Sequence, residues 1–180
     1  MADLLVRDSA PEDLPAIQKI YAYEVLHGLA TFEEVPPSAD ELGQRRQAVI
    51  EMGLPHLVAE RDGEVLGYAY AGLYRPRPAY RNTVEDSVYV SETARGQGVG
   101  RALLAELVAH CEAGWRRQMI AVIGNSANRG SIELHRALGF EEIGTLKAVG
   151  FKHGQWVDTV YMQRALGEGS RTLQSPPTQG

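Results

Sequence analysis

Three glycines at alternate positions, Gly96, Gly98 and Gly100, follow a strand-like segment and open a long amphipathic run. A loop with glycine at every second position leaves its backbone N–H groups uncovered by side chains. Because the loop opens a helix, it also carries the positive end of the helix dipole, which favours a bound anion. The sequence therefore predicts a phosphate or pyrophosphate site made of backbone amides, between a strand and a helix.

Two common phosphate motifs do not match this loop. A Walker loop ends in Gly-Lys-Ser or Gly-Lys-Thr at a fixed distance from its first glycine, and no such string occurs in the 180 residues. The dinucleotide fingerprint has a different glycine spacing and an acidic residue about 20 residues later. This chain has Arg116 and Arg117 there. The P-loop is excluded, and a Rossmann site is disfavoured.

The loop resembles the (Gln/Arg)-x-x-Gly-x-(Gly/Ala) signature of the GNAT superfamily of N-acetyltransferases, with Arg95, Gly98 and Gly100 at the defining positions. In that family the loop holds the pyrophosphate of acetyl-coenzyme A. A glycine-rich turn can also serve only to pack a strand against a helix, so a second match matters. The segment 128–140, which begins at Asn128 and ends in Leu-Gly-Phe, resembles the family's downstream cofactor-binding element.

This resemblance implies an α/β (α+β) fold of the GNAT type, with a central mixed, mostly antiparallel sheet, a parallel splayed strand pair and flanking helices. Arg95, Arg101 and Arg129 are candidates for the positive charge that the phosphates need. The residues implied to bind acetyl-CoA lie on the strand end, the loop, the helix start and the downstream element: Val88, Tyr89, Val90, Arg95, Gly96, Gln97, Gly98, Val99, Gly100, Arg101, Asn128 and Ser131.

Acetyl transfer from a thioester to an amine needs a neutral amine, a polarised carbonyl and a proton for the departing thiolate. Glu85, on the strand that leads into the loop, is the candidate base, acting directly or through water; the alternative is an ordinary exposed carboxylate. Asp86 alternates to the other face of the strand and is less suited to share this task. A backbone N–H near Val88 to Val90 would polarise the carbonyl.

Most GNAT enzymes carry a tyrosine in the short helix before Leu-Gly-Phe, whereas this chain has His135 there. Histidine titrates near neutral pH and can give or take a proton. His135 is therefore a candidate for protonating the thiolate. A histidine hydrogen-bonded in the core is the alternative.

His135, the segments 86–90 and 121–124, and the pattern from Gly150 to Asp158 resemble one branch of the family, the phosphinothricin and methionine sulfoximine acetyltransferases. The resemblance covers residues 6–163, and the Phe-Lys-His-Gly string at 151–154 is specific to the branch. It implies acetylation of the α-amino group of a glutamate- or methionine-like amino acid with a tetrahedral phosphorus or sulfur centre. Such a reaction detoxifies a glutamine synthetase inhibitor.

The acceptor's carboxylate calls for a cation, and Arg75 or Arg77 in the loop before Glu85 could supply paired N–H donors. The alternative is a solvated basic turn stiffened by two prolines. Phe32 and Glu33 correspond to the family's substrate-side lip, although Phe32 could equally anchor the core. The implied acceptor-binding set contains Phe32, Glu33, Arg75, Arg77, Tyr80, Glu85, Asp86 and Ser87.

Members of this branch resemble homodimers in which loops of both subunits complete the site, so Phe151 to Trp156 is expected near an interface. His153 has no second ligand at a regular spacing, and no metal is expected. Acetyl-CoA is the expected co-substrate. Three functions stay open: an amino acid acetyltransferase, a GNAT enzyme acting on an aminoglycoside or a protein N-terminus, and a non-enzymatic acetyl-CoA-binding module, which Glu85 and His135 disfavour.

Composition predicts one domain over residues 1–165 and a disordered tail over 166–180. The net charge of −5 argues against nucleic acid or an anionic membrane as partner. No segment is long enough to span a bilayer, and the N-terminus lacks the features of a signal peptide. The single cysteine, Cys111, suits a reducing cytoplasm, where we expect the protein.

Local patterns predict the elements that position these residues. The dipeptide Asp62-Gly63 predicts a hairpin of strands 57–61 and 64–73, and Ser38 to Glu41 forms a capping box that starts a helix. An earlier helix within 9–25 begins after Ser9 or one turn later at Asp13. Further predicted elements are strands 4–7, 83–90, 119–123, 142–150 and 156–163, with 119–123 parallel to 83–90, and a helix after the glycine loop that buries Leu104, Leu107, Val108 and Cys111.

Overall fold

The computed structural model describes residues 3–173. Within them, seven strands form one sheet in the order β1-β2-β3-β4-β5-β7-β6. The β4–β5 pair is parallel and the other neighbouring pairs of this described part are antiparallel, which confirms the predicted sheet. The elements are β1 (Leu5–Asp8), α1 (Leu14–His27), α2 (Ala39–Glu51), β2 (His56–Arg61), β3 (Glu64–Leu73), β4 (Thr83–Val90), α3 (Val99–Ala113), β5 (Gln118–Gly124), α4 (Arg129–Ala137), β6 (Glu141–Lys152) and β7 (Gln155–Ala165).

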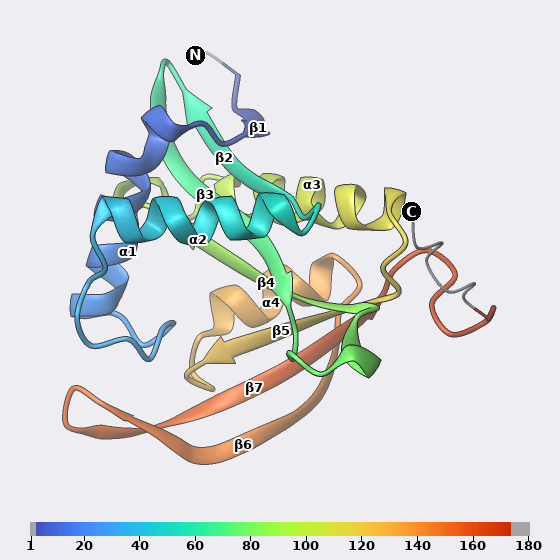
Figure 1. Ribbon diagram of the computed structural model, residues 1–180. Coiled ribbons are helices and arrows are strands. Elements are labelled where there is room, and N and C mark those ends of the chain that lie inside the picture. The colour runs from blue at the N-terminus through green and yellow to red at the C-terminus, as the bar shows by residue number, and fades with distance from the viewer. Residues whose placement is uncertain (1–2, 174–180) are drawn as a thin grey trace.

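The helices cover the sheet on both faces, with α2 in front of β2 and β3 and α3 behind them (Figure 1). Alternation along β2 supplies both cores, because successive strand residues point to opposite faces. Leu57 and Ala59 belong to the apolar cluster that contains Leu103 of α3, whereas Val58 belongs to the one that contains Ile17 of α1. The sheet is thus held rigidly between two layers.

Strands β4 and β5 are paired only over their first halves. Their register runs from Thr83 opposite Gln118 to Asp86 opposite Ala121. Beyond this point residues 87–90 stay paired with β3 alone, and residues 122–124 with β7 alone. The two strands therefore diverge after Asp86, as the splayed pair predicts, and leave one edge of β4 open.

Local turn and cap chemistry explains several element boundaries. Asp62 and Gly63 have φ values of 53° and 79°, so both central residues of the hairpin turn are left-handed, as a type I′ turn requires. The Ser38 hydroxyl accepts the N–H of Glu41 at 3.1 Å at the start of α2. The hairpin turn and the helix start at Ser38 are confirmed. Of the predicted capping box the Ser38 bond is present, while the Glu41 carboxylate accepts an N–H of Arg45 at 2.5 Å.

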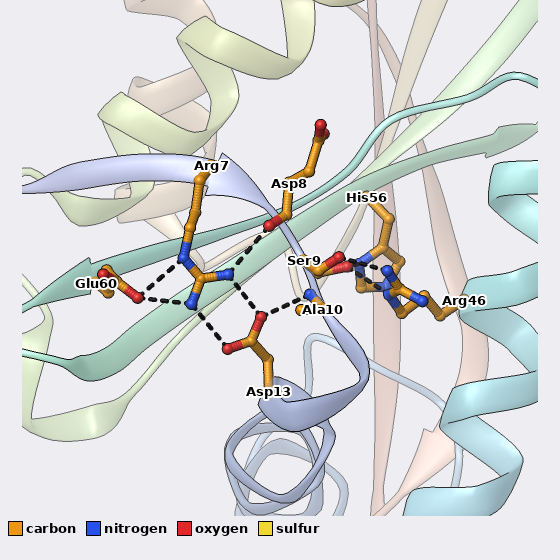
Figure 2. A network of polar contacts seen from close by, with 8 residues as sticks. All are labelled: Arg7, Asp8, Ser9, Ala10, Asp13, Arg46, His56 and Glu60. Carbon is orange, nitrogen blue, oxygen red and sulfur yellow. Dashed lines mark hydrogen bonds and ion pairs between the residues drawn. The ribbon is translucent and has the colours of Figure 1, made fainter.

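Helix α1 begins at Leu14, so the later of the two predicted starts is correct. The Asp13 carboxylate does not cap the helix; it accepts two N–H groups of Arg7 at 2.8 and 2.9 Å and the Ala10 N–H at 2.7 Å (Figure 2). Arg7 also donates to Glu60 at 2.6 Å. This network joins β1, β2 and the start of α1, and the sequence analysis did not foresee it.

A second buried contact in Figure 2 lies beside that network. The Ser9 hydroxyl is 2.9 Å from His56 Nδ1 and accepts an N–H of Arg46 from α2 at 2.7 Å. Burial, together with the charge of Arg46, lowers the pKa of His56 to about 4. His56 is therefore neutral at physiological pH, and the contact fastens α2 to β2.

The packed chain continues past residue 165. Leu166 is fully buried, and its N–H donates to the Arg117 carbonyl at 3.0 Å. The predicted disordered tail therefore does not begin at residue 166. Although the segment around it is polar, the Leu166 side chain packs in the core. Residues 174–180 lie outside the described part. Among residues 3–173, no helix has the length and apolarity needed to cross a membrane.

Candidate active site

A groove of ≈ 740 Å³ lies where β4 and β5 diverge, between the start of α3 and the segment after α1. Gly96 and Gly98 border it with φ values of 75° and 83°, and no atom lies within 4 Å of where their β-carbons would be. Helix α3 starts directly after Gly98, which has no side chain to cap it. The first N–H groups of α3 are therefore free to bind an anion, as the glycine spacing predicted.

The predicted acetyl-CoA residues border this groove, with the exception of Gln97. Gln97 donates to the Thr93 carbonyl at 2.8 Å and accepts from Arg61 at 3.0 Å. Arg129 does not border the groove either. The predicted residues along its wall are Val88, Tyr89, Val90, Arg95, Gly96, Gly98, Val99, Gly100, Arg101, Asn128 and Ser131.

Arg95 is held in place by a residue that sequence analysis missed. Its guanidinium forms an ion pair with Glu24 of α1, which is only 8% exposed. The same guanidinium lies over the Tyr23 ring, 5.6 Å from the ring centre. Glu24 itself borders the groove. The pairing fixes the direction of Arg95, and no local pattern could have revealed it because 71 positions separate the two residues.

A smaller cavity of ≈ 280 Å³ continues from the groove through the gap between the two strands. Several residues border both spaces, among them Val88, Tyr89 and Ser131, so a molecule in the groove can meet one in the cavity. Tyr70, which the sequence analysis did not single out, also borders the cavity. The predicted catalytic and acceptor residues that the structure brings together here are Phe32, Glu85, Asp86, Ser87 and His135.

Glu85 has the electrostatics of a general base. Burial raises the pKa of its carboxyl group to about 7; the charge of Asp86 also raises it, and that of Arg75 lowers it. A base works best when its pKa lies near the operating pH, because it is then both available and strong enough to accept a proton. Glu85 meets this condition at neutral pH.

Asp86 and His135 form a buried pair on the wall of the same cavity. His135 Nε2 donates to Asp86 Oδ2 at 2.9 Å, and His135 Nδ1 donates to the Ser131 carbonyl at 2.7 Å. Burial lowers the pKa of His135, but the hydrogen bond to Asp86 and its charge outweigh burial and leave that pKa raised. Sequence analysis placed both residues near the site without foreseeing that they pair.

The basic loop before β4 does not border the cavity. Arg75 lies over the Tyr74 ring at 5.1 Å, and the Tyr80 ring meets the edge of Tyr74 at 5.6 Å. Arg77 is absent from the cavity wall too. Of these predicted acceptor residues, Arg75 lies near enough for its charge to lower the pKa of Glu85.

The lip segment 28–33 is fastened to the sheet by contacts that the sequence did not reveal. Lys152, only 2% exposed, donates to the Thr31 carbonyl at 2.8 Å. A methyl group on Gly150 would lie 2.5 Å from the Phe32 ring, so glycine lets this ring lie against β6. Phe32 is 44% exposed and is no core anchor. Glu33 accepts from Arg45 at 2.6 Å and from Tyr21 at 2.8 Å, outside the cavity.

A profile of the Acetyltransferase (GNAT) family matches residues 20–140, the stretch that holds the groove, Glu85 and His135. The chain belongs to the GNAT acetyltransferase family. This acetyltransferase is 58% identical over 169 residues to the phosphinothricin N-acetyltransferase of Alcaligenes faecalis, with 94% of this chain and 84% of that protein covered. It is 42% identical over 162 residues to an L-methionine sulfoximine/L-methionine sulfone acetyltransferase of Pseudomonas paraeruginosa, covering 89% and 94% of the two chains.

A crystal structure of a GNAT superfamily phosphinothricin acetyltransferase from Sinorhizobium meliloti in complex with acetyl-CoA has the same fold. Its TM-score is 0.93 at 52% identity, with 98% of this chain and 95% of that chain covered. These comparisons confirm the family and the fold that the motifs implied. Within residues 3–173, no three His, Cys, Asp or Glu side chains are grouped to hold a metal ion.

Proposed function

We propose that this enzyme transfers the acetyl group of acetyl-CoA to the α-amino group of an amino acid of the phosphinothricin and methionine sulfoximine type. The observation that carries the proposal is Glu85: the pKa of its carboxyl group is raised to about 7, and it borders a small cavity that joins the groove. The substrates named for its relatives support this acceptor class. The reaction would detoxify such inhibitors in the cytoplasm.

The groove provides the parts that acetyl-CoA requires. The free amides at the start of α3 would bind the diphosphate, and Arg101 would add positive charge, while Arg95 is held at the wall by its ion pair with Glu24. The open edge of β4, over residues 87–90, would pair with the amide groups of the pantetheine arm. The thioester would then reach the junction of groove and cavity, where Glu85 can act on an incoming amine.

Glu85 removes a proton from the amine as its nitrogen attacks the thioester carbonyl. A backbone N–H near Val88 to Val90 stabilises the negative charge that develops on the carbonyl oxygen. The carbon–sulfur bond then breaks. The departing thiolate takes a proton that comes from the face of β4 on which His135 lies. Asp86 holds His135 there at 2.9 Å.

The acceptor cavity suits a small amino acid. Its ≈ 280 Å³ is little for an aminoglycoside, and Phe32 and Ser87 border it without opening a groove for a peptide. Arg75 was a candidate for the acceptor's carboxylate, but it does not border the cavity. Its role in this proposal is its positive charge, which lowers the pKa of Glu85.

We also propose that the enzyme is a homodimer. Strands β6 and β7 form a long hairpin along the lower edge of the view in Figure 1. Its apolar side chains are exposed by 49–69%, and the Phe151 and Trp156 rings contact each other at 5.1 Å. Several exposed large apolar side chains on one hairpin favour an interface at this place. The residues of this surface are Ile143, Leu146, Val149, Phe151 and Trp156.

The test is thiol release from acetyl-CoA in the presence of phosphinothricin, methionine sulfoximine, methionine sulfone, an aminoglycoside or a short peptide. We expect turnover with the first three acceptors and a far lower kcat/KM with the others. Preferred turnover of the aminoglycoside or the peptide would assign the enzyme to another amine. Binding of acetyl-CoA without turnover of any acceptor would leave a binding module.

A further inference from the structure

Ser131, Asp86 and His135 form a chain of polar atoms that ends at the junction of groove and cavity. His135 Nε2 lies 2.9 Å from Asp86 Oδ2, and on the other side of the ring Nδ1 lies 3.4 Å from the Ser131 hydroxyl. The other oxygen of Asp86 is buried and has no hydrogen-bond partner within the described residues. His135 is therefore the partner on which this buried carboxylate depends.

His135 is enclosed, since only 3% of the residue is exposed, whereas Ser131 is half-buried and borders both spaces. Both ring nitrogens of His135 also point at acceptors, the Asp86 carboxylate and the Ser131 carbonyl. This geometry favours hydrogen on both nitrogens and a positively charged ring, and the raised pKa of His135 agrees with it. Both ring nitrogens are engaged by Asp86 and Ser131, so a proton that leaves the ring passes first to one of these partners.

The same geometry excludes Ser131 as a nucleophile. A base that activates a serine needs a lone pair on the nitrogen that faces the hydroxyl. The nitrogen that faces the Ser131 hydroxyl is Nδ1, and its hydrogen lies between the Ser131 carbonyl at 2.7 Å and the Ser131 hydroxyl at 3.4 Å. His135 can therefore give a proton to Ser131 but cannot take one from it.

We infer that the Ser131 hydroxyl delivers the proton of His135 to the departing thiolate, and that Asp86 keeps His135 charged for this task. This inference rests on the proposed function. Ser131 is then a catalytic residue that touches the leaving group, and Asp86 is a positioning residue that acts through His135. The sequence analysis gave His135 as a candidate for protonating the thiolate, whereas the roles of Ser131 and Asp86 follow from the structure.

The proton transfers balance. As the amine nitrogen bonds to the acetyl carbon, the electron pair of the carbon–sulfur bond passes to sulfur. Sulfur takes the hydroxyl proton of Ser131, and Ser131 takes the Nδ1 proton of His135. The His135 ring is then neutral, and its Nε2–H stays hydrogen-bonded to Asp86. Glu85 holds the proton lost by the amine. It gives this proton to water, and His135 regains one from water, so both residues return to their starting state.

The other titratable groups near this chain do not compete with it. Cys111 of α3 senses the charge of Asp86, but burial above all raises the pKa of its thiol to about 12, so it stays neutral. The Glu85 side chain points to the face of β4 opposite that of Asp86. The Phe140 ring meets the edge of the His135 ring at 5.0 Å and excludes water from that side.

The test compares Ser131→Ala with Ser131→Thr in the full-length enzyme, with acetyl-CoA and the best amino acid of the acceptor panel. We expect kcat of Ser131→Ala to fall by about 10- to 100-fold, the low end for general acid catalysis because a thiolate is a good leaving group. The threonine variant keeps a hydroxyl and should retain most of the activity. Calorimetric titration with coenzyme A separates a loss of binding from a loss of proton delivery.

Asp86→Asn provides a second measurement, the pH dependence of kcat. A purely structural role of Asp86 would leave this pH dependence unchanged. Without the carboxylate the pKa of His135 falls, so the alkaline limb of the kcat profile should shift to lower pH. Nitrogen-15 NMR at pH 7 should show His135 protonated on both nitrogens in the wild type and on one in Asp86→Asn. The double variant Ser131→Ala/Asp86→Asn should be no slower than the slower single variant, because the three groups act as one unit.

If the wild type turns over and kcat of Ser131→Ala is unchanged, proton delivery through Ser131 is refuted and the proposed function stands. Losses that multiply in the double variant, or a neutral His135 ring in the wild type, also refute it. An absence of wild-type turnover with every acceptor refutes both. If Asp86→Asn does not fold, the alanine and threonine variants of Ser131 decide alone.

Discussion

Adjacent carboxylates on β4 have opposite surroundings at the point where the sheet opens. Glu85 faces the acceptor side, where burial raises its pKa to about 7 and Arg75 acts only through its charge. Asp86 faces α4 and is more deeply buried, yet it is paired with His135 at 2.9 Å. Burial without a partner makes a proton acceptor, whereas burial with a partner makes a fixed charge that holds another group protonated.

In the proposed mechanism, this difference assigns one proton to each side of the strand. The amine would lose its proton on the side of Glu85, and the thiolate would gain one on the side of Asp86 and His135. Because Glu85 and Asp86 are adjacent on β4, both transfers could occur around a single thioester. Enzymes that run acid and base chemistry at one pH separate their titratable groups in this way.

The largest expected effect comes from Glu85→Gln, which removes the base and keeps the shape. We expect kcat/KM at pH 7 to fall by about 10²- to 10⁴-fold, the usual contribution of a general base. Initial-rate measurements check this, with coenzyme A affinity as a test of folding. Glu64→Gln, at the exposed start of β3, is the matched control. Activity within twofold of the wild type would remove Glu85 from the mechanism.

Asp86→Ala should destabilise the fold, because it leaves His135 buried without its carboxylate. Breaking a buried pair from one side costs about 3 kcal/mol, which urea unfolding can measure. The raised pKa of His135 gives the sign with pH: the stabilisation is full below the ordinary value of 6.5 and is lost as pH rises through the folded-state pKa. An equal loss at pH 5.5 and at high pH would contradict the ion pair.

Glu85→Gln should make the protein more stable at alkaline pH, in contrast to Asp86→Ala. The pKa of Glu85 is raised above its ordinary 4.5, so the wild type loses stability as pH rises from 4.5 past about 7, and glutamine does not. We expect a melting temperature about 2 to 4 °C above that of the wild type at pH 8, and no gain at pH 4. A gain that is independent of pH would indicate another cause.

The smallest effect is expected from Arg75→Gln. Its charge lowers the pKa of Glu85, so the acidic limb of the kcat/KM profile should move to higher pH. The shift should stay below about one pH unit, because water screens an exposed charge. Arg77→Gln serves as the matched control. Coincident profiles for the wild type and Arg75→Gln would show that Arg75 lies too far from Glu85 to act on it.

The sequence predicted those parts of the molecule that depend on neighbours along the chain. The glycine loop, the Asp62-Gly63 turn and the Ser38 cap follow from the backbone preferences of a few adjacent residues. The groove wall formed by β4, the glycine loop and the start of α3 is made of such backbone features, so this part could be predicted. The part formed by Glu24 and residues 27–30 could not. Gln97 was predicted for the wall, but its side chain pairs with Arg61 instead.

The contacts that complete the site join residues far apart in sequence. Asp86 and His135 are separated by 49 positions, and Lys152 and Thr31 by 121. Only the packing of α4 and β6 against the strands brings these groups together, and no periodicity encodes a particular partner. The end of the packed chain was misjudged for a similar reason, because the burial of Leu166 depends on a space in the core.

The most direct test of the comparison is a carbon-13 NMR titration of the glutamate carboxyl groups, with Glu85→Gln used to assign the Glu85 signal. The account predicts a titration midpoint of about 7 for Glu85, coincident with the acidic limb of the kcat/KM profile. A midpoint near the ordinary 4.5 would contradict it, because Glu85 would then be a solvated carboxylate and no base for the amine.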